Sequence, residues 1–175
     1  MVNSMEASTP ANFLADQDTP ALVAATAELL LHKGWMLATA ESCTGGLIAG
    51  ACTELAGSSA WFERGFVTYS NAAKSEMLGV PYWLIERHGA VSEDVARAMA
   101  GGALTHSRAT LSVAVTGIAG PDGGTPEKPV GLVYFAAGRR DTEMASESVM
   151  FGDLGRAEVQ RRSVAQALKM LRSLL

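Results

Sequence analysis

The sequence predicts a three-layer α/β/α sandwich built around a mixed β-sheet. Helical patterns alternate with apolar strand patterns in the first part of the chain, as expected for parallel strands connected by helices. Hairpin-like strands follow without helices between them, which favours antiparallel pairing in the C-terminal part of the sheet. The chain has 175 residues, of which 48% are hydrophobic, so one domain with a sizeable core is expected.

The predicted order of elements begins with a helix over residues 20–33. Thr19 and Pro20 suit its N-cap and first helical position, and Gly34 suits its end. After it, apolar runs predict strands, and segments with helical periodicity predict helices, the last of which carries an apolar stripe beginning at Val164. The order after the first helix is strand 35–41, helix 44–55, strand 61–69, helix 71–78, a short helix near 82–88, helix 92–106, strands 110–116, 130–138 and 143–151, and helix 156–174.

The composition is typical of a small soluble enzyme. The net charge is -4 and the isoelectric point about 5.4, which gives no reason to expect nucleic-acid binding, and no apolar run is long enough for a membrane span. Cys43 and Cys52 have neither disulfide nor metal spacing, so reduced thiols in a cytoplasmic protein are expected. Residues 1–18 are polar and lack a signal peptide, and we expect them to be disordered and residues 19–175 to form a single domain.

The segment Ala40-Glu41-Ser42-Cys43-Thr44-Gly45-Gly46 lies where an apolar run gives way to a helical pattern. A strand-to-helix turn can expose a catalytic hydroxyl beside unpaired backbone N–H groups, and glycines let a ligand approach the backbone closely. We therefore expect Ser42 to be a nucleophile and the N–H groups around Thr44, Gly45 and Gly46 to hold an oxyanion. The alternative is that serine or threonine at this place only caps the helix.

A second polar cluster supplies a candidate base for this serine. Lys74 falls in the first turn of the predicted helix 71–78, where the helix dipole and partial burial both lower the pKa of an amine. Lys74 could then accept the proton of Ser42, with the hydroxyl of Tyr69 relaying or orienting it. The alternative is a solvated surface lysine.

Other catalytic arrangements are disfavoured. All histidines of the chain fall near predicted helix ends, where they commonly face backbone carbonyl groups: His32, His88 and His106. Without a positioned histidine, Cys43 also lacks the partner that would turn it into a thiolate nucleophile.

A glycine-rich loop, residues 116–126, follows the apolar strand 111–115. The end of a buried strand is the usual place for a ligand crevice in an α/β sheet, so Thr116 and Gly117 are candidate substrate contacts. The glycine spacing matches neither a dinucleotide-binding loop nor a triphosphate-binding loop. A plain connection between strands is the alternative, although the loop is longer than most.

These segments together resemble a known family. The chain resembles the C-terminal domain family of the competence-damage-inducible protein CinA in four sequence segments: 40–49, 67–74, 89–92 and 115–131. The characterised members of that family are nicotinamide-nucleotide amidohydrolases. The resemblance begins near Leu22 and extends to the C-terminus. It implies that Ser42, Tyr69 and Lys74 are catalytic and that Thr116 lies beside the substrate.

The start of the last helix departs from the family pattern. Family members usually read Gly-Asp-Arg there, whereas this chain reads Gly152-Asp153-Leu154-Gly155-Arg156, with one residue inserted. An arginine at a helix start suits a phosphate, since its guanidinium and the N-terminal N–H groups can reach the same anion. The resemblance therefore implies a phosphate contact at Arg156, with a solvated arginine as the alternative.

The leading function is hydrolysis of the carboxamide of nicotinamide mononucleotide to nicotinate mononucleotide and ammonia. We expect no metal or cofactor, because the sequence offers no compact set of ligands. The competing readings are a non-catalytic nucleotide-binding module and an amidase for another small amide. A small-molecule nucleotide is the expected partner, a homodimer is left open, and the length suggests the stand-alone form of the family.

Overall fold

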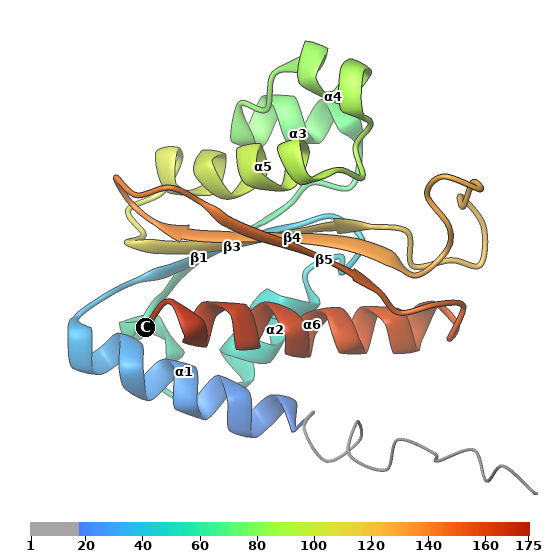
Figure 1. The fold of residues 1–175 in the computed structure, drawn as a ribbon. Coiled ribbons are helices and arrows are strands. Elements are labelled where there is room, and N and C mark those ends of the chain that lie inside the picture. Colours follow the sequence, from blue (N-terminus) through green and yellow to red (C-terminus); the bar gives the residue numbers. More distant parts are fainter. Residues whose placement is uncertain (1–17) are drawn as a thin grey trace, which may run out of the picture.

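The computed structural model describes residues 18–175, which form a mixed sheet between two layers of helices (Figure 1). In spatial order the strands are β2 (Phe62–Val67), β1 (Leu37–Glu41), β3 (Leu111–Gly117), β4 (Leu132–Arg139) and β5 (Ala145–Met150). β1 runs parallel to β2 and β3, whereas β4 is antiparallel to β3 and to β5. The predicted α/β/α sandwich with a mixed sheet is confirmed.

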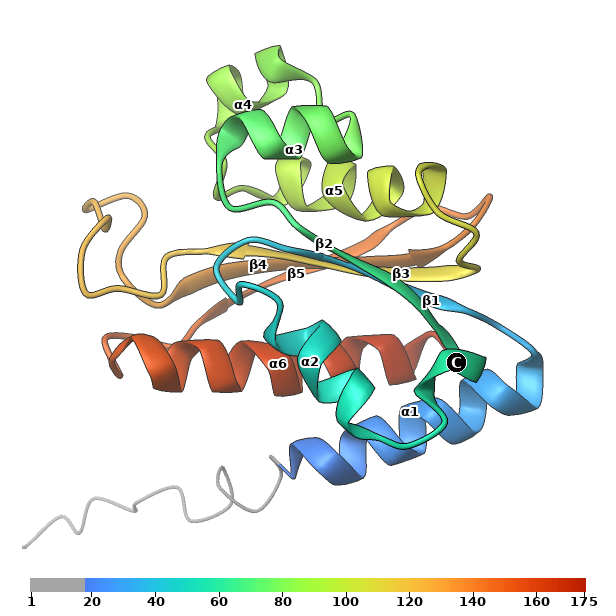
Figure 2. The ribbon, with the colours of Figure 1, turned by 180° about the vertical axis from the view of Figure 1, so that it is seen from behind.

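The helices divide between the two faces of the sheet, as Figures 1 and 2 show. On one face lie α3 (Asn71–Leu78), α4 (Tyr82–His88) and α5 (Glu93–Thr105), and on the other lie α1 (Thr19–Lys33), α2 (Leu47–Glu54) and α6 (Arg156–Ser173). The side chains of β3 alternate between the two cores: Val113 and Val115 pack on the side of α6, and Ala114 packs on the side of α5. Because both faces of this strand are buried, its sequence is an almost continuous apolar run.

Two helix starts differ from the prediction. Thr19 was expected to cap α1, but the cap is Asp18, whose Oδ1 accepts a hydrogen bond from Ala21 N at 3.3 Å. The predicted helix 44–55 begins only at Leu47, because Gly45 and Gly46 have φ values of 58° and 98°, which a right-handed helix cannot include. Strand ends lie within two residues of the predicted positions, and the end of β1 at Glu41 matches its prediction. The rest of the expected disordered segment, residues 1–17, lies outside the described residues.

The parallel strands end at the same edge of the sheet and bring the predicted site segments together (Figure 2). Glu41, the last residue of β1, pairs with Val67 of β2 and Val115 of β3. The strand pairing continues one step beyond, since Ser42 N donates to Val115 O at 3.0 Å and Thr68 N donates to Glu41 O at 2.8 Å. The end of β1 and Ser42 are thereby fixed between the segments after β2 and β3, which supply further site residues.

Candidate active site

Lys74 and Ser42 are in direct contact at this edge. Lys74 Nζ donates hydrogen bonds to Ser42 Oγ and to Thr68 O, each at 2.9 Å. Lys74 comes from the first turn of α3, which Ser70 caps by accepting a hydrogen bond from Ala73 N at 3.0 Å. The cap therefore sets the start of the helix from which the lysine reaches the serine.

The surroundings of Lys74 favour its neutral form. Its side chain is only 1% exposed, and this burial lowers its pKa below the ordinary value, with the neighbouring Cys43 acting weakly in the opposite direction. Its polar contacts are a hydroxyl and a carbonyl oxygen, neither of which carries a full negative charge. A lysine with a lowered pKa beside a serine hydroxyl can act as a general base.

Ser42 is not used as a helix cap. The N-cap of α2 is Gly46, and no side chain of the cap residue bonds to the first turn. Cys43, its neighbour, is buried, and this burial raises the pKa of its thiol to about 12. A thiol with that pKa is protonated at neutral pH, so the hydroxyl of Ser42 is the better nucleophile of the two.

Ser42 opens into a pocket of about 230 Å³. The residues around it come from the ends of β1, β2 and β3 and from the start of α6: Ser42, Cys43, Tyr69, Gly117, Ile118, Ala119, Gly120, Asp122, Gly123 and Arg156. The structure thus brings Ser42, Tyr69, Gly117 and Arg156 together around one space, with Lys74 behind the serine.

Arg156 joins Tyr69 to the glycine-rich loop. Its Nη2 donates a short hydrogen bond to the Tyr69 hydroxyl, and its Nη1 donates to Gly120 O at 3.0 Å. Tyr69 is 59% exposed, and its hydroxyl is bonded to Arg156 rather than to Ser42 or Lys74. The insertion before α6 therefore leaves Arg156 at the pocket, although not in contact with the serine.

The candidate residues Thr44 and Thr116 have their hydroxyls turned to the protein. Thr44 Oγ1 donates to Glu41 Oε2 at 2.8 Å, and Thr116 Oγ1 donates to Ala90 O at 2.8 Å. Both residues are fully or almost fully buried and neither lines the pocket. Thr116 belongs to strand β3, so the loop begins after it.

Two of the backbone donors expected for the oxyanion, those of Gly45 and Gly46, are also occupied. Gly45 N donates to Ser42 O at 3.0 Å, and Gly46 N donates to Glu41 Oε2 at 3.1 Å. The sequence reasoning missed the carboxylate of Glu41, although an acidic residue just before a helix N-terminus is a recognisable signal for an interaction with that terminus.

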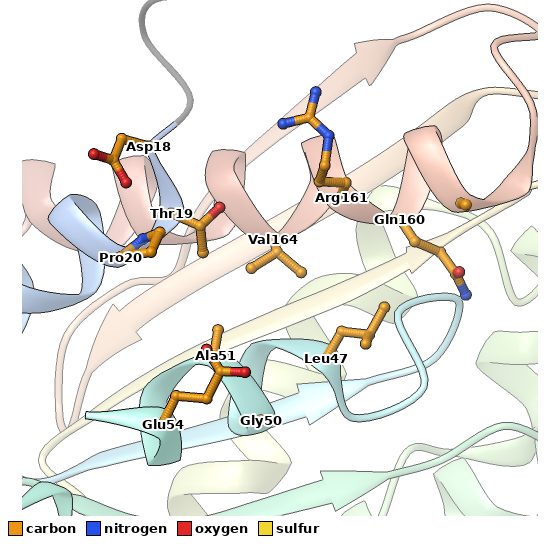
Figure 3. A pocket seen from close by; sticks show the side chains of 11 residues that line it. Asp18, Thr19, Pro20, Leu47, Gly50, Ala51, Glu54, Gln160, Arg161 and Val164 are labelled. Carbon is orange, nitrogen blue, oxygen red and sulfur yellow. The ribbon is translucent and has the colours of Figure 1, made fainter. Parts of the chain in front are cut away.

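A larger cavity, of about 560 Å³, lies between the N-terminus of α1, α2 and α6 (Figure 3). Its walls include the apolar side chains of Leu47, Ala51 and Val164, and Ser42, Tyr69 and Lys74 do not line it. Gln160 belongs to its lining and donates to Cys43 O at 2.8 Å. We place the candidate active site in the smaller pocket, because the candidate nucleophile Ser42 lines it and contacts the candidate base Lys74.

Residues 18–175 contain neither a metal-ligand cluster nor a helix that could span a membrane. In this part of the chain no group of three or more His, Cys, Asp or Glu side chains is arranged to hold a metal ion. None of the helices described there has both the length and the apolar character needed to cross a membrane.

The fold and the site define a class of α/β protein with a serine–lysine pair at the carboxyl ends of parallel strands and a glycine-rich loop beside it. Comparison with known families then gives the particular one. The chain belongs to the CinA C-terminal domain family, whose model matches residues 19–175.

Several relatives have a named activity or a solved structure. The chain is 48% identical, over 90% of its length and 95% of the relative's, to the nicotinamide-nucleotide amidohydrolase PncC of Escherichia coli K12. It is 51% identical to a putative competence-damage inducible protein of Symbiobacterium thermophilum, of which it spans only 40%. The crystal structure of the competence/damage inducible protein CihA of Agrobacterium tumefaciens matches 89% of this chain and 94% of its own, with a TM-score of 0.88 and 51% identity.

Proposed function

We propose that this protein hydrolyses the carboxamide of nicotinamide mononucleotide, giving nicotinate mononucleotide and ammonia. The observation that carries the proposal is the 2.9 Å contact between Ser42 Oγ and Nζ of a lysine that is buried and has a lowered pKa. The substrate is suggested by the relatives from Escherichia coli and Enterobacter agglomerans, both named nicotinamide-nucleotide amidohydrolases.

In the first half of the reaction, neutral Lys74 takes the proton of Ser42 while Oγ attacks the carboxamide carbon. The C=O bond opens to an oxyanion. Lys74, now an ammonium, returns its proton to the nitrogen, the C–N bond breaks, and ammonia leaves an ester on Ser42. In the second half Lys74 takes a proton from water and the resulting hydroxide attacks the ester carbon. The C–Oγ bond breaks, the Lys74 ammonium returns its proton to Oγ, and the acid product leaves as its carboxylate after losing a proton to solvent.

The oxyanion needs donors other than the occupied N–H groups of Gly45 and Gly46. We assign this role to the N–H of Cys43, since the residue after the nucleophile supplies an oxyanion donor in other strand-to-helix turns. Cys43 lines the pocket, which supports the assignment. A donor of this kind contributes about 3 kcal/mol to transition-state stabilisation.

Arg156 and Tyr69 are proposed to meet the rest of the nucleotide. The guanidinium of Arg156 has more N–H donors than its bonds to Tyr69 and Gly120 use, so it can also bind a phosphate. A phosphate that competes for this guanidinium would loosen its bond to Tyr69 and free the hydroxyl for the proton relay. At about 230 Å³ the pocket is smaller than the ~300–1,000 Å³ of typical ligand sites, which suits the carboxamide end of the nucleotide with the phosphate near Arg156.

The test is ammonia release from nicotinamide mononucleotide, compared with nicotinamide, its riboside and its dinucleotide. We expect the mononucleotide to be the preferred substrate by kcat/KM. Preference for a compound without phosphate would favour an amidase for another small amide. Absence of ammonia from all of them, with retained nucleotide binding, would favour a non-catalytic nucleotide-binding module.

A further inference from the structure

The carboxylate of Glu41 lies fully buried between the end of β1 and the start of α2. Its Oε2 accepts hydrogen bonds from Thr44 Oγ1, Gly46 N and Ile48 N, and its Oε1 accepts from Thr39 Oγ1 and Ala49 N, at distances of 2.8 to 3.2 Å. All these partners are donors, so both oxygens of the side chain serve as acceptors.

Most of these donors belong to the segment that follows Ser42. The N–H groups of Gly46, Ile48 and Ala49 form the N-terminus of α2, which otherwise has no side-chain cap. A carboxylate at a helix N-terminus satisfies unpaired N–H groups and interacts favourably with the helix dipole. Glu41 thus ties the residue before the serine to the helix after it.

The turn is held in part by its own backbone, since Gly45 N donates to Ser42 O and Leu47 N donates to Thr44 O, each at 3.0 Å. Gly45 and Gly46 have positive φ values and no side chains. The backbone is anchored at Ser42 by the bond to Val115 O, and at Cys43 O by the side-chain amide of Gln160. Between these anchors and α2, the bonds from Thr44 and Gly46 to the Glu41 carboxylate fix the path of the chain.

We propose that Glu41 is a positioning residue: its buried carboxylate holds the turn 42–46 so that Ser42 Oγ stays in contact with Lys74 Nζ and the N–H of Cys43 faces the reacting carbonyl. The inference rests on the proposed function for its substrate but concerns the nucleophile itself. The same carboxylate also occupies N–H groups at the start of α2. These groups are therefore not offered to the oxyanion, which binds the N–H of Cys43 instead.

The test variant is Glu41→Gln, which keeps the size of the side chain. In either orientation, its amide group places N–H donors against a backbone N–H, that of Ala49 on one side or those of Gly46 and Ile48 on the other. The turn must then shift. The matched control is Ser112→Ala, which removes another fully buried hydrogen bond, from Ser112 Oγ to Ala100 O, away from the turn.

Three quantities are measured on both variants: kcat and KM for nicotinamide mononucleotide, and the rate at which a fluorophosphonate labels Ser42. A displacement of about 1 Å at a reacting group costs up to about 100-fold in rate. We expect Glu41→Gln to lower kcat and the labelling rate by about 10- to 100-fold, with KM changed less than about threefold. Ser112→Ala should leave all three close to wild type even if its Tm falls as much.

The proposal is overturned if a folded Glu41→Gln protein keeps its kcat and its labelling rate, or if Ser112→Ala loses both to the same extent. It is also overturned if Glu41→Gln keeps its maximal kcat and only its pH profile moves to lower pH, because loss of a nearby negative charge lowers the pKa of an amine and Glu41 would then act through its charge on Lys74. If Glu41→Gln does not fold, Thr44→Val removes a single donor from the carboxylate, and it should show the same losses in smaller measure.

The labelling rate separates this inference from the proposed substrate. A wild-type protein that releases no ammonia from the mononucleotide would contradict the proposed function. Ser42 would still be labelled, and a slower labelling of Glu41→Gln would still support the role of Glu41. Equal labelling of both proteins would reject that role whatever the substrate is.

Discussion

Replacing Lys74 with arginine keeps a positive charge behind the serine but removes the group that can become neutral. Arginine does not give up its proton at any pH that the protein tolerates. In the wild type, Lys74 Nζ lies 2.9 Å from Ser42 Oγ, in a side chain that is only 1% exposed. The substitution therefore separates the charge of this residue from its capacity to act as a base.

The size of the effect follows from the role of a general base, which contributes about 10²- to 10⁴-fold to the rate. The expected loss of kcat/KM in Lys74→Arg is of this size, or about 2.7 to 5.4 kcal/mol. The matched control is Lys128→Arg, because Lys128 Nζ also donates to backbone carbonyls, those of His88 and Val91, but does not contact Ser42. It should lose far less.

The wild-type pH profile provides a second readout. Burial lowers the pKa of Lys74, and the active form is the deprotonated amine, so kcat/KM should rise with pH through this lowered pKa. The ascending limb should therefore lie below the ~10.4 of an ordinary lysine. Ammonia release is measured at each pH for the wild type, Lys74→Arg and Lys128→Arg. If folded Lys74→Arg keeps most of its activity, Lys74 supplies only charge and the proposed mechanism is refuted.

Three other substitutions test separate parts of the site. Arg156→Ala should raise KM for nicotinamide mononucleotide by about 10- to 100-fold, because charge-assisted bonds contribute about 1.5 to 3 kcal/mol each. The kinetics with the unphosphorylated riboside should hardly change, and equal losses with both substrates would mean that Arg156 supports the fold or the position of Ser42. Tyr69→Phe should lower kcat by about tenfold or more if the hydroxyl relays a proton, and a rise in KM alone would limit Tyr69 to holding Arg156. Gly46→Ala should lower Tm by several degrees, because φ is 98° and a Cβ would lie 3.3 Å from Val67 Cγ2. Its control, Gly50→Ala, adds a Cβ in open space inside α2 and should raise Tm slightly; equal Tm values in thermal unfolding would count against the strain at Gly46.

The order of helices and strands could be predicted from the sequence because periodicity and apolar runs are local signals. The start of α2 could not be predicted, because it depends on the positive φ values of Gly45 and Gly46. Glycine allows several backbone conformations, so its presence in the sequence does not specify which one occurs. The parallel strands explain why Ser42 and Lys74 meet, as the sequence predicted: segments after neighbouring parallel strands share one edge.

The details of the site depend on contacts that sequence spacing does not reveal. The bond from Arg156 to Tyr69 joins residues 87 positions apart, and nothing local indicates it. The position of Glu41 just before a predicted helix indicates a contact with the helix N-terminus, but only the fold shows which N–H groups it takes: those of Ile48, Ala49 and Gly46, of which Gly46 was expected at the oxyanion. Thr44 was expected to offer its backbone N–H to the oxyanion and Thr116 to lie beside the substrate, and the hydroxyls of both are bonded within the protein.

The most direct test of the central claim compares ammonia release by Ser42→Ala and Cys43→Ala with nicotinamide mononucleotide as substrate. Both variants shorten a side chain at adjacent positions of one turn, so their folding can be matched by Tm. Ser42→Ala should lose activity by about 10⁴-fold or more, whereas Cys43→Ala should keep most of it, since its thiol has a pKa of about 12 and only its backbone N–H is used. An active Ser42→Ala protein, or a folded Cys43→Ala protein that binds substrate but releases no ammonia, would contradict the account.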